Sequence, residues 1–139
     1  MKNLRIEEML MAPLTKQEIA EIQRKKRAKQ VLQLCIVMMI SDRVAHDKEL
    51  LKIYEFLFED PYFKDIDING EDLQDLIRAI QRERVSMGLR KIIKKYSKIT
   101  DLQTREKAKI YMAKIIPADG YAHDKELEAL KFLENIWNT

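Results

Sequence analysis

The residues best suited to chemistry in this chain occur in a nine-residue segment that is present twice. Residues 42–50 read DRVAHDKEL and residues 119–127 read DGYAHDKEL, so seven of nine positions are identical across a separation of 77 residues. Each copy supplies two aspartates, one glutamate and one histidine. These are Asp42, His46, Asp47 and Glu49 in the first copy and Asp119, His123, Asp124 and Glu126 in the second.

Such a residue set is suited to binding a divalent metal ion. Carboxylate oxygens are the ligands that Ca²⁺ and Mg²⁺ prefer, and imidazole suits a softer ion such as Mn²⁺ or Zn²⁺. We therefore expect the six carboxylates of the two copies to offer metal ligands, with His46 and His123 as additional ones. Converging carboxylates repel each other unless a cation lies between them. Arg43 places a cation beside the first copy, so the second copy is the better metal candidate.

The same residues also fit a purely structural interpretation. A helix that begins near Asp47 needs groups that satisfy its first backbone N–H groups, and acids in its first turn interact favourably with the helix dipole. If His46 is the N-cap, Glu49 occupies the third helical position, where a capping box has its acid. His123 and Glu126 repeat this spacing. Both interpretations remain open from the sequence alone.

The elements that must position these turns are helices. Apolar residues recur at helical spacing nearly throughout, and no window shows a sustained two-residue alternation. The chain has only three Gly and three Pro, residues that form the turns between short strands, so many short strands are not expected. We predict one all-α domain over residues 1–139, a bundle of about six or seven helices. Two pseudo-symmetric helix-turn-helix repeats are expected at about 31–58 and 108–137, and the intervening helices at roughly 70–98 cover them.

Individual helices are marked by caps and apolar stripes. Thr15 with Glu18 and Thr100 with Gln103 have the spacing of capping boxes, and an additional short helix is expected in the first ten residues. The helices after the two copies carry the stripes Leu50, Ile53, Tyr54 and Leu57, and Leu127, Leu130, Leu133 and Trp137, and a helix before the second copy carries Ala108, Tyr111, Met112 and Ile115.

Charge is distributed unevenly along the chain, whose net charge is +3. Residues 42–75 hold eleven acids and four bases, whereas residues 82–98 hold seven bases and one acid. The basic helices, with Lys91, Lys94 and Lys95, support an alternative function as a binder of nucleic acid or anionic surfaces. We do not expect nucleic acid to be the partner, because no aromatic residues interleave with the bases to stack on nucleotides.

Several other classes of protein are not indicated. Residues 65–76 begin like a calcium-binding EF-hand loop, but the twelfth position is Leu76 where a bidentate Glu is needed. No phosphate-binding glycine loop or nucleophile motif is present, so no enzyme is predicted. The longest apolar run, residues 31–40, is too short to span a membrane, and its Cys35 is expected to be a buried thiol. With no export signal apparent at the N-terminus, we expect a cytoplasmic protein.

The second copy resembles the repeated motif of the TerB-like family of tellurite resistance proteins. The family pattern is an apolar helix that ends in Ala-Asp-Gly, then five residues, then a Glu that opens the next helix. Ala118, Asp119, Gly120 and Glu126 match it, while the first copy keeps Asp42 and Glu49 but has Ser41 and Arg43 in place of Ala and Gly. The resemblance is strong over roughly 31–58 and 108–137 and weak between them.

This resemblance implies a non-catalytic, cytoplasmic helical domain of a stress response, with acidic residues that bind a divalent metal ion and contact a protein partner. It does not imply which ion among Ca²⁺, Mg²⁺, Mn²⁺ and Zn²⁺ is bound, nor who the partner is. Fold-level likeness does not carry a specific function with it. Tellurite resistance is therefore the expectation from the family alone.

Overall fold

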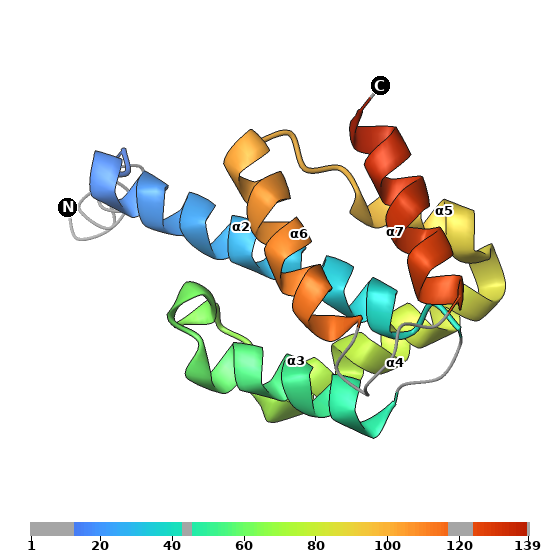
Figure 1. The fold of residues 1–139 in the computed structure, drawn as a ribbon. Coiled ribbons are helices and arrows are strands. Elements are labelled where there is room, and N and C mark those ends of the chain that lie inside the picture. The colour runs from blue at the N-terminus through green and yellow to red at the C-terminus, as the bar shows by residue number, and fades with distance from the viewer. Residues whose placement is uncertain (1–12, 43–45, 117–123, 139) are drawn as a thin grey trace.

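The computed structural model describes residues 13–42, 46–116 and 124–138. These residues form six α-helices, a short 3-10 helix and no strand, which confirms the predicted all-α bundle (Figure 1). The helices are α2 (Lys16–Met39), α3 (Asp47–Glu59), η1 (Pro61–Phe63), α4 (Gly70–Met87), α5 (Leu89–Tyr96), α6 (Leu102–Ile115) and α7 (Asp124–Trp137). The additional helix expected in the first ten residues lies outside the described residues. None of the described helices is both long and apolar enough to cross a membrane.

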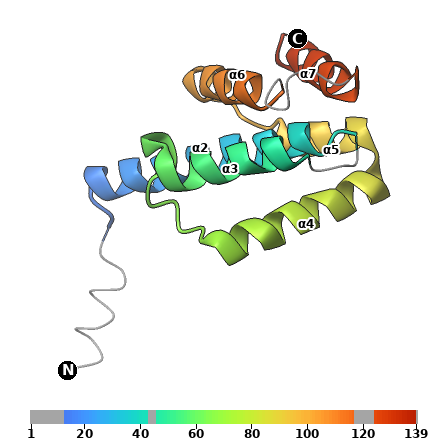
Figure 2. The same cartoon turned by 60° about the horizontal axis from the view of Figure 1, so that its bottom comes forward.

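Helix α2 is the centre of the bundle. It contacts α3, α4, α5, α6 and α7, and its most extensive packing is against α6. In Figure 2, α6 and α7 lie above the level of α2 and α3, whereas α4 lies below it. The N-terminal part of α2 extends beyond the other helices. The helices α4 and α5 between the two motif copies pack on α2 and on each other, and α5 also packs on α7.

The core forms around the C-terminal half of α2. Residues 34–40 are all fully buried, because helices pack on every side of this apolar run. Cys35 belongs to this run, and burial raises the pKa of its thiol, as expected for a structural cysteine. An aromatic cluster extends the core, in which the rings of Phe56 and Phe63 each meet Tyr111 edge-on with centroids 4.9 Å apart. The Tyr111 hydroxyl donates a hydrogen bond of 2.9 Å to Asp60.

Two predicted caps differ in outcome. Thr15 accepts a hydrogen bond of 3.1 Å from the backbone N–H of Glu18, so it caps α2 as predicted. The predicted cap at Thr100 is wrong. Asp101 is the N-cap of α6, and its side chain accepts hydrogen bonds from both the N–H and the hydroxyl of Thr104. A carboxylate can accept both donors at once, which explains why the helix begins one residue later than expected.

The stripe on α7 also differs from the prediction by one position. Leu133 and Trp137 are buried as expected, but Leu127 is 48% exposed and Glu126 takes the buried position beside it. On α6, by contrast, the whole predicted stripe is buried. A carboxylate therefore lies on the core side of α7, at the start of the helix.

Candidate metal centre

The first motif copy begins where α2 ends against the core. Ser41 is fully buried, and its hydroxyl donates a hydrogen bond of 2.8 Å to the carbonyl of Met38, which closes the last turn of the helix. Asp42 follows directly, so its position is fixed by a rigid, buried helix end. His46 occupies the N-cap position of α3, the position that the structural interpretation of the motif considers. Its ring does not cap the helix, however, because Nε2 lies 2.8 Å from Oδ2 of Asp42.

The second motif copy contributes through the first turn of α7. Glu126 is the third residue of that helix and is fully buried. It shares the core face of α7 with Ala129, Leu133 and Trp137, which are also buried. The indole Nε1 of Trp137 donates a hydrogen bond of 2.9 Å to the carbonyl of Ser97, just after α5. The hydrogen bond at the far end of α7 and the buried residues along its core face hold the helix against the bundle, with Glu126 on that face.

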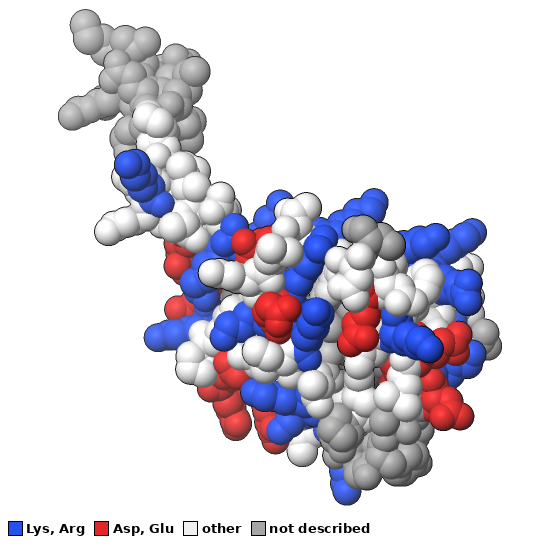
Figure 3. Space-filling model, turned by 45° about the horizontal axis from the view of Figure 1, so that its top comes forward, with Lys and Arg blue, Asp and Glu red and all other residues white. Residues whose placement is uncertain are grey.

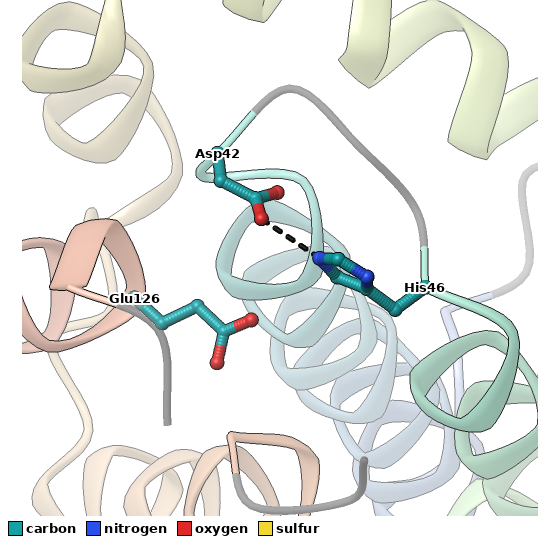
Figure 4. A group of neighbouring side chains, drawn as sticks. All are labelled: Asp42, His46 and Glu126. Carbon is teal, nitrogen blue, oxygen red and sulfur yellow. Dashed lines mark hydrogen bonds and ion pairs between the residues drawn. The ribbon is translucent and has the colours of Figure 1, made fainter. Parts of the chain in front are cut away.

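These three side chains meet at the junction of the two copies. One ligand atom each from Asp42, His46 and Glu126 can be chosen such that all three atoms lie within 4.8 Å of one another. Figure 4 shows the Glu126 carboxylate pointing from α7 toward the hydrogen-bonded pair of Asp42 and His46. Asp42 and His46 are partly buried, with side chains 19% and 28% exposed. The cluster therefore joins the turn between α2 and α3 to the start of α7 at the edge of the core.

The other acids of the motif divide into two kinds. Glu49 is the third residue of α3, and like Glu126 at the same position of α7 it is fully buried. Asp47 and Asp124 are the first residues of their helices and are exposed. The two copies therefore share one pattern in which the first acid of the helix faces solvent and the third faces the core.

Part of the predicted site lies outside the described residues. Asp119 and His123 of the second copy belong to residues 117–123, and so does Gly120, while Arg43 belongs to residues 43–45. The ligand roles predicted for Asp119 and His123 stay predictions. So does the role of Arg43 as a cation beside the first copy.

Arg84 supports the centre but is not among the site residues predicted from the motif. This arginine of α4 is buried, and its Nε and Nη2 donate hydrogen bonds of 3.1 and 2.9 Å to the carbonyl of Ser41. It thereby fixes the backbone that immediately precedes Asp42. In the sequence, Arg84 is indistinguishable from the other bases of residues 82–98, because its burial depends on how α4 packs against α2.

The arrangement of Asp42, His46 and Glu126 has the chemistry of a metal ligand set. Zn²⁺ binds carboxylate oxygen and imidazole nitrogen at about 2.0–2.2 Å, which places tetrahedral ligands about 3.4 Å apart. The Asp42–His46 contact of 2.8 Å is shorter than this spacing, so an ion would have to replace that hydrogen bond with two metal–ligand bonds. A mixed nitrogen and oxygen set favours Mn²⁺ or Zn²⁺ over Ca²⁺ and Mg²⁺, which prefer oxygen ligands throughout.

The basic helices that support the alternative function are placed differently. Lys91 and Lys94 of α5 are exposed, whereas Nζ of Lys95 lies 2.6 Å from Oε2 of Glu83, a hydrogen bond that raises the pKa of Lys95. On the face shown in Figure 3, Lys and Arg are interspersed with Asp and Glu among the coloured residues. The binding of nucleic acid or anionic surfaces stays a prediction from composition.

Compared with protein-family models, with curated proteins and with solved structures, the chain gives no match. The TerB-like resemblance therefore rests on the motif residues alone. The arrangement of side chains at the junction of the two copies is the observation on which a functional proposal can be built.

Proposed function

We propose that this chain is a non-catalytic, TerB-like interaction module that binds a divalent cation with Asp42, His46 and Glu126. The observation that carries the proposal is the convergence of these three side chains, two from the turn between α2 and α3 and one from α7, with one ligand atom each within 4.8 Å of the others. Two carboxylates and an imidazole form a ligand set for Mn²⁺ or Zn²⁺. A protein partner in a cytoplasmic stress response is the role that the TerB-like resemblance implies.

The position of Glu126 beside the Asp42–His46 pair supports this proposal over a purely structural turn. A surface acid in the first turn of a helix is sufficient to interact with the helix dipole, and exposed Asp124 is placed to do so on α7. Glu49 is as deeply buried as Glu126, so burial alone does not mark a ligand, but Glu126 is the one that meets the Asp42–His46 pair. A divalent cation held there would contact residues of both motif copies. The helix-end role and the metal role thus belong to different acids of the same motif.

The metal would connect parts of the chain that are far apart in sequence. Asp42 follows α2 and His46 precedes α3 in the first copy, while Glu126 lies in the second copy. An ion bound by all three would hold the start of α7 against the turn between α2 and α3. In this proposal the cation stabilises the surface formed at the junction of the two copies, on which a protein partner would dock.

Isothermal titration calorimetry tests this assignment. We expect the metal-stripped protein to bind Mn²⁺ or Zn²⁺, and the variants Asp42→Asn and His46→Ala each to lose one equivalent of bound ion. Asp47→Asn is the matched control, because Asp47 belongs to the same motif but is exposed at the first position of α3. Equal loss in the control and in Asp42→Asn would show that net charge rather than this ligand set attracts the ion.

A further inference from the structure

A groove of about 850 Å³ lies away from the metal centre, between the end of α3, η1 and the start of α4. Its lining runs from residue 57 to residue 72 and includes none of Asp42, His46 and Glu126. This volume is in the range of sites that bind a small molecule or part of a peptide. The acidic segment at residues 65–72, which fails as an EF-hand loop, forms one wall of the groove.

The floor and one edge of the groove are apolar. Leu57, Phe63 and Ile66 line it and belong to the buried core. Phe58 also lines it but is 58% exposed. Its ring is held in place, because it stacks on Tyr54 with centroids 6.0 Å apart and lies over the start of α4. An apolar side chain placed beside Phe58 would therefore remove a pre-positioned aromatic ring from water.

The remaining lining is strongly acidic. Five carboxylates line the groove, namely Glu59, Asp60, Asp65, Asp67 and Asp72, against one base among the same lining residues, Lys64. Asp60 accepts hydrogen bonds from the backbone N–H of Tyr62 and from the Tyr111 hydroxyl, and Asp72 accepts one from the backbone N–H of Asn69. Asp67 lies 3.5 Å from Nζ of Lys25, a base of α2. Glu59, Asp65, Asp67 and Asp72 are exposed. The charge of the groove is thus opposite in sign to the net +3 of the whole chain. Such a surface attracts a basic ligand and repels phosphate groups.

We propose that this groove, formed by residues 57–72, docks a basic amphipathic peptide segment of a protein partner. An apolar side chain of the segment packs on the floor beside Phe58. Flanking Lys or Arg side chains pair with Glu59 and Asp65 and compete with Lys25 for Asp67. This rests on the proposed function as an interaction module and names the chemistry of its partner. The acidic lining excludes a nucleic acid or an anionic membrane as the occupant of this groove, and the apolar floor makes it unlike a site for a bare cation.

The charge of the groove can be changed without changing its backbone. Asp65 and Asp67 adopt left-handed conformations, with φ of 57° and 63°. Asn is among the few residues that accept this region readily, so the double variant Asp65→Asn/Asp67→Asn removes two charges and keeps the local fold. Glu106→Gln/Glu128→Gln is a matched control, because both residues are exposed acids outside the lining. Circular dichroism confirms that each variant is folded.

Fluorescence anisotropy with labelled peptides tests the proposal. The probe is KRKLFKRK, compared with KRKSSKRK, which has no apolar anchor, and with EEELFEEE, which has the opposite charge. We expect KRKLFKRK to bind most tightly and the Asp65→Asn/Asp67→Asn variant to weaken it about tenfold, from the loss of two exposed ion pairs. The Glu106→Gln/Glu128→Gln control should bind as the parent does. The variant Phe58→Ser should remove the preference for KRKLFKRK over KRKSSKRK.

Three outcomes would overturn the proposal. Absence of binding to KRKLFKRK at low salt would do so, and so would equal weakening in the control variant. Self-association of the chain that is lost in Asp65→Asn/Asp67→Asn would assign the groove to a second copy instead. Repeating the peptide titration with Glu126→Gln in EDTA separates this proposal from the metal centre, because the groove should bind the peptide whether or not an ion is held by Glu126.

Discussion

Binding of a divalent cation at the metal centre should raise the thermal stability of the whole chain. Asp42 and His46 lie in the turn between α2 and α3, and Glu126 lies at the start of α7, so unfolding separates Glu126 from the other two ligands. An ion that binds the native state and not the unfolded chain stabilises by an amount set by its concentration relative to its dissociation constant. The turn between α2 and α3 and the start of α7 should gain most of this stabilisation.

The size of the effect follows from the length of the chain. An ion at about 100 times its dissociation constant contributes about 2.7 kcal/mol. The entropy of unfolding is about 2.1 cal/mol/K per residue, or about 0.29 kcal/mol/K for 139 residues. The ratio of the two values predicts a rise in Tm of about 9 °C, which is large compared with the precision of a melting experiment.

Differential scanning calorimetry of the EDTA-treated protein, with and without Mn²⁺ or Zn²⁺, measures this shift. The variant Glu126→Gln keeps the shape of the side chain and should lose nearly all of the rise. Glu128→Gln, two residues further along α7 and exposed, should keep it. If no divalent ion at millimolar concentration raises Tm, the metal assignment is wrong and the motif is turn architecture. An equal shift in both variants would place the ion elsewhere.

Three further predictions concern the residues that hold the helices in place. Arg84→Met removes both hydrogen bonds to the carbonyl of Ser41 and should cost about 2–3 kcal/mol in urea unfolding, with weaker metal affinity in titration; unchanged metal affinity would contradict its positioning role. Asn69→Ala removes the cap of α4 and should cost about 1 kcal/mol in the same assay, whereas Asn69→Asp should not. The Thr104 hydroxyl and N–H hold the pKa of Asp101 below its usual range, so its stabilisation is complete at neutral pH and is lost as pH falls through that lowered pKa. When the pH is lowered below about 4, the Tm of Asp101→Asn should therefore fall less than the Tm of the parent protein. An identical fall in both proteins would refute this linkage.

The sequence predicts the helices well, because the apolar spacing of each helix is a local property of its own residues. The start of α4 at Gly70 agrees with the intervening helices expected from roughly residue 70, and Asn69 and Asp72 cap it by each accepting the backbone N–H of the other. The start of α6 is not correctly predicted, because Thr100 and Asp101 are adjacent residues that can both cap a helix. Only the competition for the donors of Thr104 decides between them.

The candidate metal centre is harder to predict from the sequence than the helices are. The motif identifies Asp42, His46 and Glu126 among eight candidates, but their meeting depends on long-range packing of α7 on α2 and α5. The burial of Glu49 and Glu126 could have been inferred from their helical spacing to Ile53 and Ala129, which places each acid on a core face. The role of Arg84 could not, because its partner is a backbone carbonyl 43 residues away.

In the proposed metal centre, ligands from both motif copies bind one cation. Anomalous diffraction from crystals grown with Mn²⁺ or Zn²⁺ tests it most directly, because the position of the ion is measured independently of the protein atoms. We expect a peak at metal–ligand distance from Asp42, His46 and Glu126 together. A peak bound by the residues of one copy alone, or at the exposed Asp47 or Asp124, would contradict it.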